Sequence, residues 1–443
     1  MRTSRLPVKP MEDIVLKGLT GFIIKFICRI AEIFGFWKLP SKKAAADILD
    51  MSLLDKIYWV YKSLNPIVQP EKDNPLKKGA SDSYSFQLPD GFEKGEDVTI
   101  GAVGDMMKVG GLEHSKDFLY EKVADLIFEN DIVYGNFESQ LTEQEIVEMV
   151  FKEDESPELC CTKEQYEALK SHRGKNYTVF HTACNHTMDK GMEGLQTTLK
   201  HLQADQIMDI GTNLKPEDQD KGKIVDVNGI RIGFVSATFG LNGRTVPAGE
   251  EYRVNVAKLH NPNGPADVSL LQNQIADCQQ QNCDFIIASL HWGFEYEFFP
   301  RTDQVQTTHL LVEAGVDAII SHHPHVIQPV EVYQTKRDPD RLAVIAYSLG
   351  NLTSPYSAPP LALSQILNLS LNKGTFKDKS RTYIDSYLAT PVVQTESENQ
   401  GKPAIQPVKV SDVNEMDDCP LEQSYLEELN TYVDLVQGEF RVD

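Results

Sequence analysis

Two histidines that flank a single proline are the residues of this sequence best suited to metal chemistry. His323 and His325 lie in the segment SHHPH, which follows the apolar run DAII. Pro324 fixes the backbone between them, and in extended geometry both imidazoles can face one centre. Zinc, manganese and iron all accept imidazole nitrogens as ligands. Taken alone, such a pair is more often two surface histidines, so its meaning depends on the rest of the sequence.

Potential metal ligands also follow several other apolar runs. They are Asp105 after VTIGAVG, Asn136 and Glu138 in YGNFES, Asn185 in TACNHTMDKG, and His291 and Glu295 in SLHWGFEYE. One Gly-Asp pair would ordinarily be a turn. In open α/β sheets, however, the carboxyl ends of neighbouring strands open onto one crevice. Because chance would not place a ligand after nearly every apolar run, we interpret these residues as one metal site.

The segment TACNHTMDKG contains two further residues that could take part in a reaction. His186 offers an imidazole, which can act as a general acid near neutral pH. Asp189 precedes a predicted helix that begins near Lys190, so capping is its more ordinary role and direct catalysis the alternative. We treat His186 and Asp189 as candidate catalytic residues.

The elements that would position these side chains alternate between short strands and helices. Apolar runs begin at Val98, Asp131, Tyr177, Ile230, Asp284, Asp317 and Leu342, and helical patterns cover 116–130, 191–204, 267–281 and 303–314. This alternation predicts an α/β domain. Segments beginning at Ile366, Tyr383 and Ala404 alternate without helices between them, so we expect them to complete a sheet as antiparallel strands.

The chain is expected to have three parts. Residues 1–95 form a helical N-terminal extension and linker, 96–415 the α/β domain, and 416–443 a helical C-terminal tail. The apolar stretch 16–37 is interrupted by charges, which argues against a membrane span and a signal peptide. Its periodicity predicts an amphipathic helix that packs on its own domain or a second subunit, with peripheral membrane contact as the alternative. We therefore expect a cytoplasmic or peripherally membrane-associated protein.

Composition excludes several classes of protein. The 443 residues carry a net charge of −22, which argues against nucleic acid as a partner. Seven scattered cysteines without C-x-x-C spacing indicate neither a disulfide framework nor a structural zinc site. The sequence has no Walker A loop and no G-x-S-x-G elbow, so an ATP ligase or a serine hydrolase is not indicated.

A set of motifs in order resembles a known family. In chain order the motifs are GDMM, GNFES, ACNHTMDKGMEG, LHWGFEYEFFP with Gln304, GVDAIISHHPHVIQPVE and IAYSLGNL. They are similar to motifs of the CapA family of bacterial capsule and poly-γ-glutamate biosynthesis proteins. The resemblance covers about 255 of the 443 residues. It implies a divergent member of the calcineurin-like metallophosphoesterase superfamily, with a four-layer β-sandwich flanked by helices and a site for two metal ions.

The resemblance also implies roles for individual residues. Asp105 would bind the first metal, Asn136 and Glu138 would supply a bridging ligand, and Asn185 and His291 would bind the second. His323 and His325 would be divided between the two metals, and His186 would lie near the leaving group. The chain departs from the wider superfamily at Met107, where D-x-H usually has its histidine, and at Asn136, where an aspartate is usual; Glu138 or Glu295 would have to substitute for it.

Together with these residues, the resemblance implies a hydrolase with two divalent transition-metal ions, manganese, iron or zinc, acting on a phosphoester or a polyglutamate-type amide. Its substrate would be an anionic small molecule or polymer, and capsule-synthesis proteins its partners. The alternative is a non-catalytic accessory protein that holds a capsular polymer during synthesis or export. A purely structural or interaction protein is the third possibility.

Overall fold

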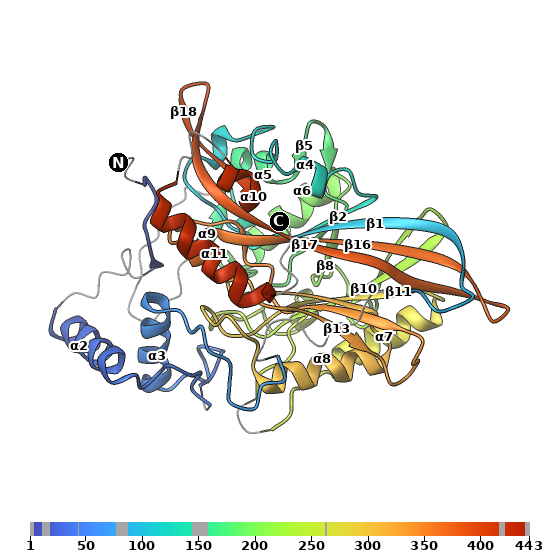
Figure 1. The fold of residues 1–443 in the computed structure, drawn as a ribbon, viewed down its shortest axis with the longest axis horizontal. Coiled ribbons are helices and arrows are strands. Elements are labelled where there is room, and N and C mark those ends of the chain that lie inside the picture. Colours follow the sequence, from blue (N-terminus) through green and yellow to red (C-terminus); the bar gives the residue numbers. More distant parts are fainter. Residues whose placement is uncertain are drawn as a thin grey trace.

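Two β-sheets packed face to face form the centre of the protein, and helices cover their outer faces (Figure 1). This computed structural model describes residues 4–10, 18–42, 44–76, 87–143, 158–261, 264–415 and 421–438. The predicted α/β fold, a four-layer β-sandwich of the metallophosphoesterase-like type, is confirmed. Among the described residues, no helix combines the length and the apolarity that crossing a bilayer requires.

The first sheet has eight strands. In spatial order seven of them are β18 (Lys402–Lys409), β17 (Lys379–Asn399), β16 (Leu363–Phe376), β1 (Glu93–Met106), β2 (Ile132–Asn136), β7 (Val179–His181) and β8 (Met208–Ile210), and β15 (Asn351–Thr353) pairs with the end of β1. Strands β1, β2, β7 and β8 run parallel, whereas β16, β17 and β18 are antiparallel, as predicted.

The second sheet has six strands. In spatial order they are β13 (Val330–Gln334), β14 (Leu342–Ala346), β12 (Ala318–His322), β11 (Phe285–His291), β10 (Ile230–Thr238) and β9 (Lys223–Val227). The four central strands are parallel and buried on both faces, which accounts for their nearly continuous apolar sequences. Two small pairs lie outside the sheets: β3 (Gln140–Leu141) with β4 (Cys160–Cys161), and β5 (Ser171–His172) with β6 (Lys175–Asn176).

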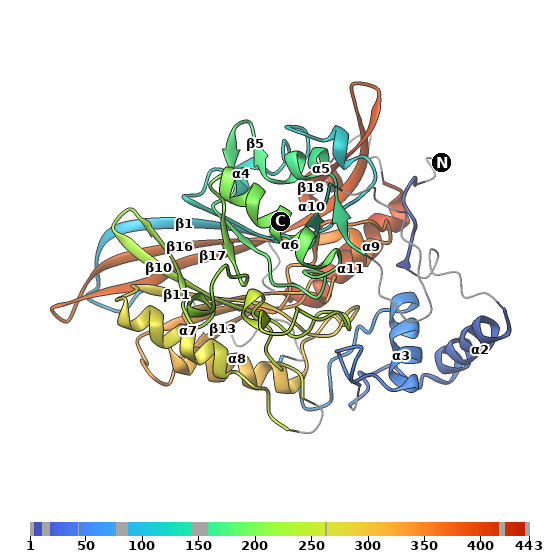
Figure 2. The same ribbon diagram turned by 180° about the vertical axis from the view of Figure 1, so that it is seen from behind.

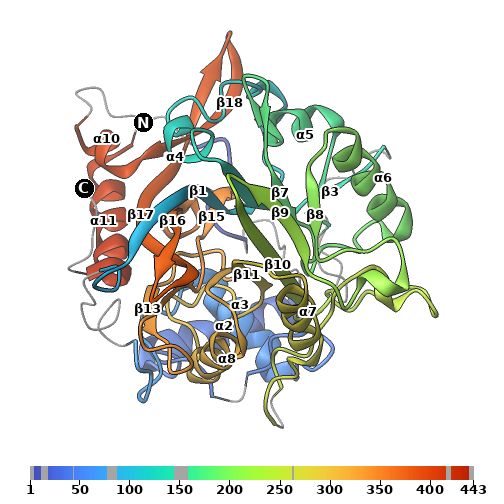
Figure 3. The same ribbon diagram turned by 90° about the vertical axis from the view of Figure 1, so that its right-hand side faces the viewer.

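Helices complete the layers. They are α2 (Gly18–Phe34), α3 (Leu53–Leu64), α4 (Ala124–Ile127), α5 (Lys163–Leu169), α6 (Gly191–Ala204), α7 (Ser269–Gln280), α8 (Thr302–Ala314), α9 (Pro359–Ala362), α10 (Val410–Glu415) and α11 (Gln423–Gln437), with 3-10 turns Leu112–His114, Pro216–Asp218 and Glu251–Arg253. Helices α4, α5 and α6 contribute to the core outside the first sheet, and α7 and α8 to the core outside the second (Figure 3). Helices α2 and α3 lie together beside the sandwich (Figure 2).

The structure differs from the sequence-based expectations in the shorter helices. The segment 116–130, predicted to be helical, is a series of turns that ends in the single helical turn α4. In the extension, which the sequence predicts to be helical, residues 44–52 form turns and bends, and α3 begins only at Leu53, where Ser52 and Asp55 form a capping box. Strand β1 begins at Glu93, two residues before the expected end of the extension. The division at 95 and 415 stays a prediction.

Candidate metal centre

Asp105, near the end of strand β1, is the carboxylate around which the candidate centre is built. Its neighbour Gly104 has no room for a side chain, because a Cβ there would lie 2.0 Å from the Gly350 carbonyl oxygen. This close approach lets the Asp105 N–H donate to the same oxygen over 2.8 Å. Glycine at position 104 therefore allows two backbones to meet at the edge of the site.

Histidines and an amide surround the buried Asp105 carboxylate. Oδ1 lies 3.3 Å from His322 Nδ1, and Oδ2 lies 3.1 Å from His325 Nδ1. Asn136 Nδ2 donates to Oδ1 over 2.8 Å. Burial acts to raise the pKa of Asp105, but the close contacts with the His322 and His325 rings outweigh it and hold that pKa well below its usual range. Asp105 is therefore an anion at neutral pH, the form that binds a cation.

Glu138 is the second buried carboxyl group of the centre, and its surroundings differ from those of Asp105. Neither Glu138 oxygen accepts a hydrogen bond from any residue that the structure describes. His291 Nε2 and His325 Nε2 lie 3.5 and 3.8 Å from Oε1. Burial is the main cause that raises the pKa of Glu138 well above its usual range. A buried carboxyl group without hydrogen bonds is costly, and a metal ion would satisfy it.

The histidines of the centre respond to this environment in opposite ways. Burial lowers the pKa of His291 and of His323 well below the usual range, so both are neutral and have a lone pair to offer. Burial also acts to lower the pKa of His325, but the neighbouring Glu138 and Asp105 carboxyl groups raise it to about 10. His291 also contacts Asn185 Oδ1 through Nε2 over 2.8 Å.

Three overlapping groups of side chains bring potential ligand atoms within 4.8 Å of one another. They are Glu138, His291 and His323; Glu295, His323 and His325; and Asp105, Glu138 and His325. Ligand atoms about 2.0–2.3 Å from one ion lie about 3–4.5 Å apart, so each group fits a divalent ion after small adjustments. These buried clusters could hold metal ions. The predicted ligands Asn136 and Asn185 lie beside the clusters through their contacts with Asp105 and His291.

The conformation of the H-x-H segment differs from the expected one. His323 and His325 have φ angles of +97° and +59°, so the segment is not extended. Left-handed backbone is unfavourable for residues other than glycine and is found mostly at functional sites. The backbone N–H of His323 donates to Asp105 Oδ2 over 3.3 Å. The turn thus brings the His323 N–H and the His325 imidazole to the same carboxylate.

His186 and Asp189 form a separate pair beside these clusters. His186 Nδ1 lies 2.8 Å from Asp189 Oδ2, and Arg244 Nη1 lies 2.9 Å from Asp189 Oδ1. Asp189 also accepts the Leu159 N–H over 2.6 Å, whereas no side chain caps helix α6, whose N-cap residue is Lys190. The capping interpretation of Asp189 is therefore wrong. Its carboxylate fixes the His186 ring instead.

Two buried histidines near the centre were not singled out from the sequence. His322 ends β12 directly opposite His291 on β11, and its Nε2 lies 2.8 Å from the Tyr134 hydroxyl. His181 ends β7, with its ring 6.0 Å from that of His322. Neither His181 nitrogen has a hydrogen-bond partner among the described residues. Their position at the ends of apolar strands, the same signal that identified His291, could have found both.

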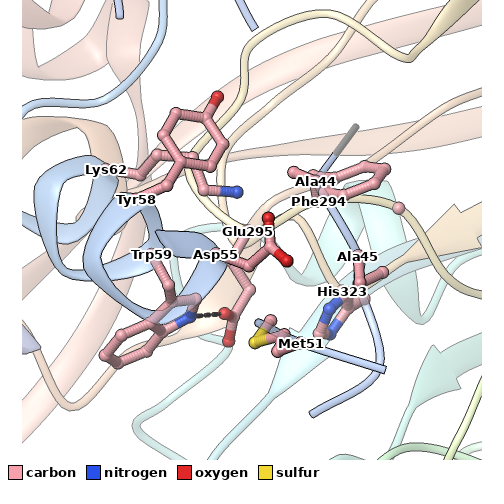
Figure 4. Close-up of a pocket in the computed structure, with 12 residues that line it drawn as sticks. Ala44, Ala45, Met51, Asp55, Tyr58, Trp59, Lys62, Phe294, Glu295 and His323 are labelled. Carbon is pink, nitrogen blue, oxygen red and sulfur yellow. Dashed lines mark hydrogen bonds between the residues drawn. The ribbon is translucent and has the colours of Figure 1, made fainter. Parts of the chain in front are cut away.

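One side of the centre opens into a narrow pocket. Figure 4 shows Glu295 and His323 together with Tyr58, Trp59 and Lys62 around it. The latter three residues belong to α3, in the N-terminal extension. The extension is therefore in contact with the candidate ligands.

Sequence comparisons place the chain among known proteins. Residues 99–356 match the family model described as "Bacterial capsule synthesis protein PGA_cap". The PGA biosynthesis protein CapA of Bacillus subtilis (strain 168) is 31% identical over 301 residues, which cover 66% of this chain and 73% of that protein. The capsule biosynthesis protein CapA of Bacillus anthracis is 29% identical over 263 residues, covering 58% and 59% of the two chains.

A probable polyglutamine synthesis accessory protein of Mycobacterium tuberculosis is 27% identical over 182 residues, covering 39% of this chain and 44% of that protein. The matched region 99–356 contains all the candidate ligands, from Asp105 to His325, and leaves out helices α2 and α3. Because the family model covers more than half of the residues, the chain belongs to the family of bacterial capsule synthesis proteins described as PGA_cap.

Proposed function

We propose that this protein is a metal-dependent hydrolase that acts on a phosphoester or a polyglutamate-type amide in capsule or poly-γ-glutamate metabolism. The observation that carries the proposal is Glu138, a fully buried carboxyl group without hydrogen bonds from the described residues. It lies among His291 and His323, which are neutral and offer nitrogen ligands, and His325, which would have to give up a proton to a bound ion. A site of this kind is complete only when a cation enters it.

Two divalent ions, manganese, iron or zinc, would supply charge stabilisation and an activated water when bound. The residues that would hold these ions are Asp105, Glu138, Glu295, His291, His323 and His325. The ions would also let a protein with a net charge of −22 bind an anionic substrate locally.

His186 is placed to donate a proton to a leaving group. Its Nδ1 contacts Asp189, which fixes the ring, and its Nε2 lies 3.4 Å from Asn242 Nδ2. Arg244 pairs with the other Asp189 oxygen, so the carboxylate that orients His186 is itself held in place. With Nδ1–H donating to Asp189, Nε2 accepts from Asn242 Nδ2, so in this proposal His186 gains a proton at Nε2 before it acts as a general acid.

The test is metal content by plasma mass spectrometry, with parallel assays of an aryl phosphate and of poly-γ-glutamate in added Mn²⁺. We expect two metals per chain and turnover of one substrate. Replacing His186 with Asn should lower turnover about 10²–10⁴-fold while leaving metal content unchanged. A protein with full metal content and no turnover of either substrate would contradict the hydrolase proposal.

Two observations favour an accessory role as the second candidate function. Met107 occupies the position where the wider superfamily has a histidine ligand, and Asn136 the position of a bridging aspartate. The mycobacterial relative is named as an accessory protein of polyglutamine synthesis. In this role the centre would bind a polyanion without cleaving it. Metal-dependent binding of poly-γ-glutamate without any shortening of the polymer would identify this function.

We also propose that α2 contacts a membrane surface. Phe22, Phe26 and Phe34 are 68, 57 and 69% exposed, whereas Cys28 and Ala31 are buried in the core shared with α3. An exposed aromatic face with basic residues beside it suits an anionic lipid surface. Replacing Phe22 and Phe26 with Ser should abolish sedimentation with phosphatidylglycerol vesicles. If the same variant instead converts a dimer to a monomer, α2 is a contact between two copies.

A further inference from the structure

The loop that carries Glu295 is held by the N-terminal extension. This loop, residues 293–301, connects β11 to α8 and lies more than 200 residues after Ile67 of the extension in sequence. The Ile67 N–H donates to the Tyr296 carbonyl over 2.8 Å, and the Phe298 N–H donates to the Ile67 carbonyl over 2.9 Å. The extension and the loop are therefore joined through their backbones on both sides of Glu297.

A buried network of charges joins the same two segments. Lys62 Nζ lies 3.0 Å from Glu297 Oε1, and Arg301 Nε donates to Glu297 Oε2 over 2.7 Å. The Tyr58 hydroxyl donates to Glu297 Oε1 over 3.0 Å. Lys62, Glu297 and Arg301 are at most 4% exposed. Buried ion pairs add little net stability because desolvation offsets their attraction, but they fix one geometry.

Further contacts hold the end of the loop where helix α8 begins. Asn74 Nδ2 donates to the Pro300 carbonyl over 2.5 Å, and the Thr302 N–H donates to Glu71 Oε2 over 2.8 Å. Arg301 Nη1 donates to the Ser41 carbonyl over 2.7 Å. Residues 41–74 thus contact the loop and its junction with α8 at several successive positions.

The remaining contact reaches a candidate ligand directly. The Trp59 indole N–H donates to Glu295 Oε2. Glu295 Oε1 is left facing His325 Nε2, 3.9 Å away, in the group formed with His323. A hydrogen bond to one oxygen of a carboxylate fixes the direction of the other. Figure 4 shows the Trp59 ring beside Glu295, on the side opposite His323.

We infer that the N-terminal extension is a working part of the metal centre, in which Trp59 positions Glu295 as a ligand and residues 41–74 hold the loop that carries it. The inference rests on the proposed binding of metal at this centre. These residues lie outside the region 99–356 that matches the family model. The extension therefore contributes to metal affinity from outside the conserved match to the family.

The test compares Mn²⁺ binding by titration calorimetry in the full-length protein and its variants. Trp59→Phe keeps the aromatic ring and removes the N–H donor. We expect one Mn²⁺ site to weaken about 10–100-fold, as found when residues that orient metal ligands are removed. Trp59→His keeps a ring N–H and should restore part of the affinity.

Trp37→Phe is the matched control. Trp37 packs on Tyr58 and Tyr61 within the extension, at ring distances of 5.4 and 5.1 Å, and among the described residues it makes no hydrogen bond or ring contact with the loop. It should bind Mn²⁺ like the wild type. If Trp37→Phe and Trp59→Phe weaken binding equally, the effect is on the stability of the extension, and the positioning role of Trp59 is overturned.

A double-mutant cycle with Glu295→Gln shows whether Trp59 acts through Glu295. If it does, Trp59→Phe adds nothing to the loss caused by Glu295→Gln. Additive losses would overturn the positioning role. Wild-type affinity in Trp59→Phe would overturn this inference and leave the proposed metal function intact, whereas a wild-type protein that binds no Mn²⁺ would overturn both.

Discussion

The candidate metal centre and the Lys62–Glu297–Arg301 network are both buried and charged, but their charges are balanced differently. Glu297 accepts hydrogen bonds from Lys62, Arg301 and Tyr58, so its charge is satisfied within the chain. Glu138 accepts none from the described residues, although its burial is as complete. The charges of the first cluster are balanced by folding alone, whereas the second cluster could hold a cation from outside.

The largest expected effect concerns the network that is already balanced. Glu297→Gln would leave Lys62 and Arg301 buried without a counter-ion, which should lower the free energy of unfolding by about 3–5 kcal/mol. Urea denaturation measures this loss. The control is Asp385→Asn, which removes the exposed ion pair with Lys94 and should cost no more than about 1 kcal/mol. Equal losses of unfolding free energy in the two variants would show that the buried network is no more sensitive to losing a carboxylate than an exposed ion pair.

Added metal should have the next largest effect. Mn²⁺ at 100 times its dissociation constant should stabilise the protein by about 2.7 kcal/mol, because the folded state alone holds the assembled ligands. Thermal unfolding with and without Mn²⁺ measures the shift. Replacing both His323 and His325 with Ala should abolish it and leave unfolding cooperative. A metal-dependent shift that survives this double substitution would place the ion elsewhere.

The pH dependence of stability sharpens the comparison further. Burial acts to raise the pKa of Glu297, but Arg301 and Lys62 outweigh it and lower that pKa below its ordinary value of 4.5. A lowered folded-state pKa gives stability that is present above 4.5 and lost as pH falls through the folded-state value.

The difference in unfolding free energy between wild type and Glu297→Gln should therefore be constant at neutral pH and shrink below pH 4.5, by at most about 1.4 kcal/mol per pH unit. Urea denaturation at a series of pH values measures it. A difference that grows on acidification would show that the Glu297 charge is not the stabilising form.

The smallest effect is expected at Glu138 in metal-free protein. Glu138→Gln keeps the size of the side chain and removes a buried carboxyl group that has no hydrogen-bond donor among the described residues. Its free energy of unfolding without metal should stay within about 1 kcal/mol of wild type. The stabilisation by Mn²⁺ should nevertheless disappear. A loss as large as that of Glu297→Gln would mean that the chain itself satisfies Glu138.

Much of the centre could be predicted from the sequence, because its ligands follow apolar strands whose ends meet at one edge. Asp105, Glu138, His291, Glu295, His323 and His325 all lie in the clusters. His181 and His322 were not predicted, because they are the last residues of strands β7 and β12 and not part of the loops that follow. The positive φ angles of His323 and His325 could not be predicted, since they depend on contacts with Asp105 from another strand.

The residues that the N-terminal extension contacts could not be predicted from the sequence either. Its amphipathic patterns indicate helices but do not say what their apolar faces contact. The contacts that Trp59, Lys62 and Ile67 make with the 293–301 loop join residues more than 200 positions apart. Likewise, segment 116–130 has a helical pattern but forms mainly turns, because tertiary packing overrides weak local preference.

The arrangement of the first sheet has a consequence for how the chain folds during synthesis. Strand β1, which carries Asp105, lies between β2, which follows within some 25 residues, and β16, where Ile100 pairs with Leu369. At about 5–20 residues per second, a ribosome needs roughly 13 to 54 seconds to make the intervening chain. During that interval one edge of an apolar strand lacks its native partner and can pair with other chains. The strand that carries Asp105 therefore stays incompletely paired until β16 has been made.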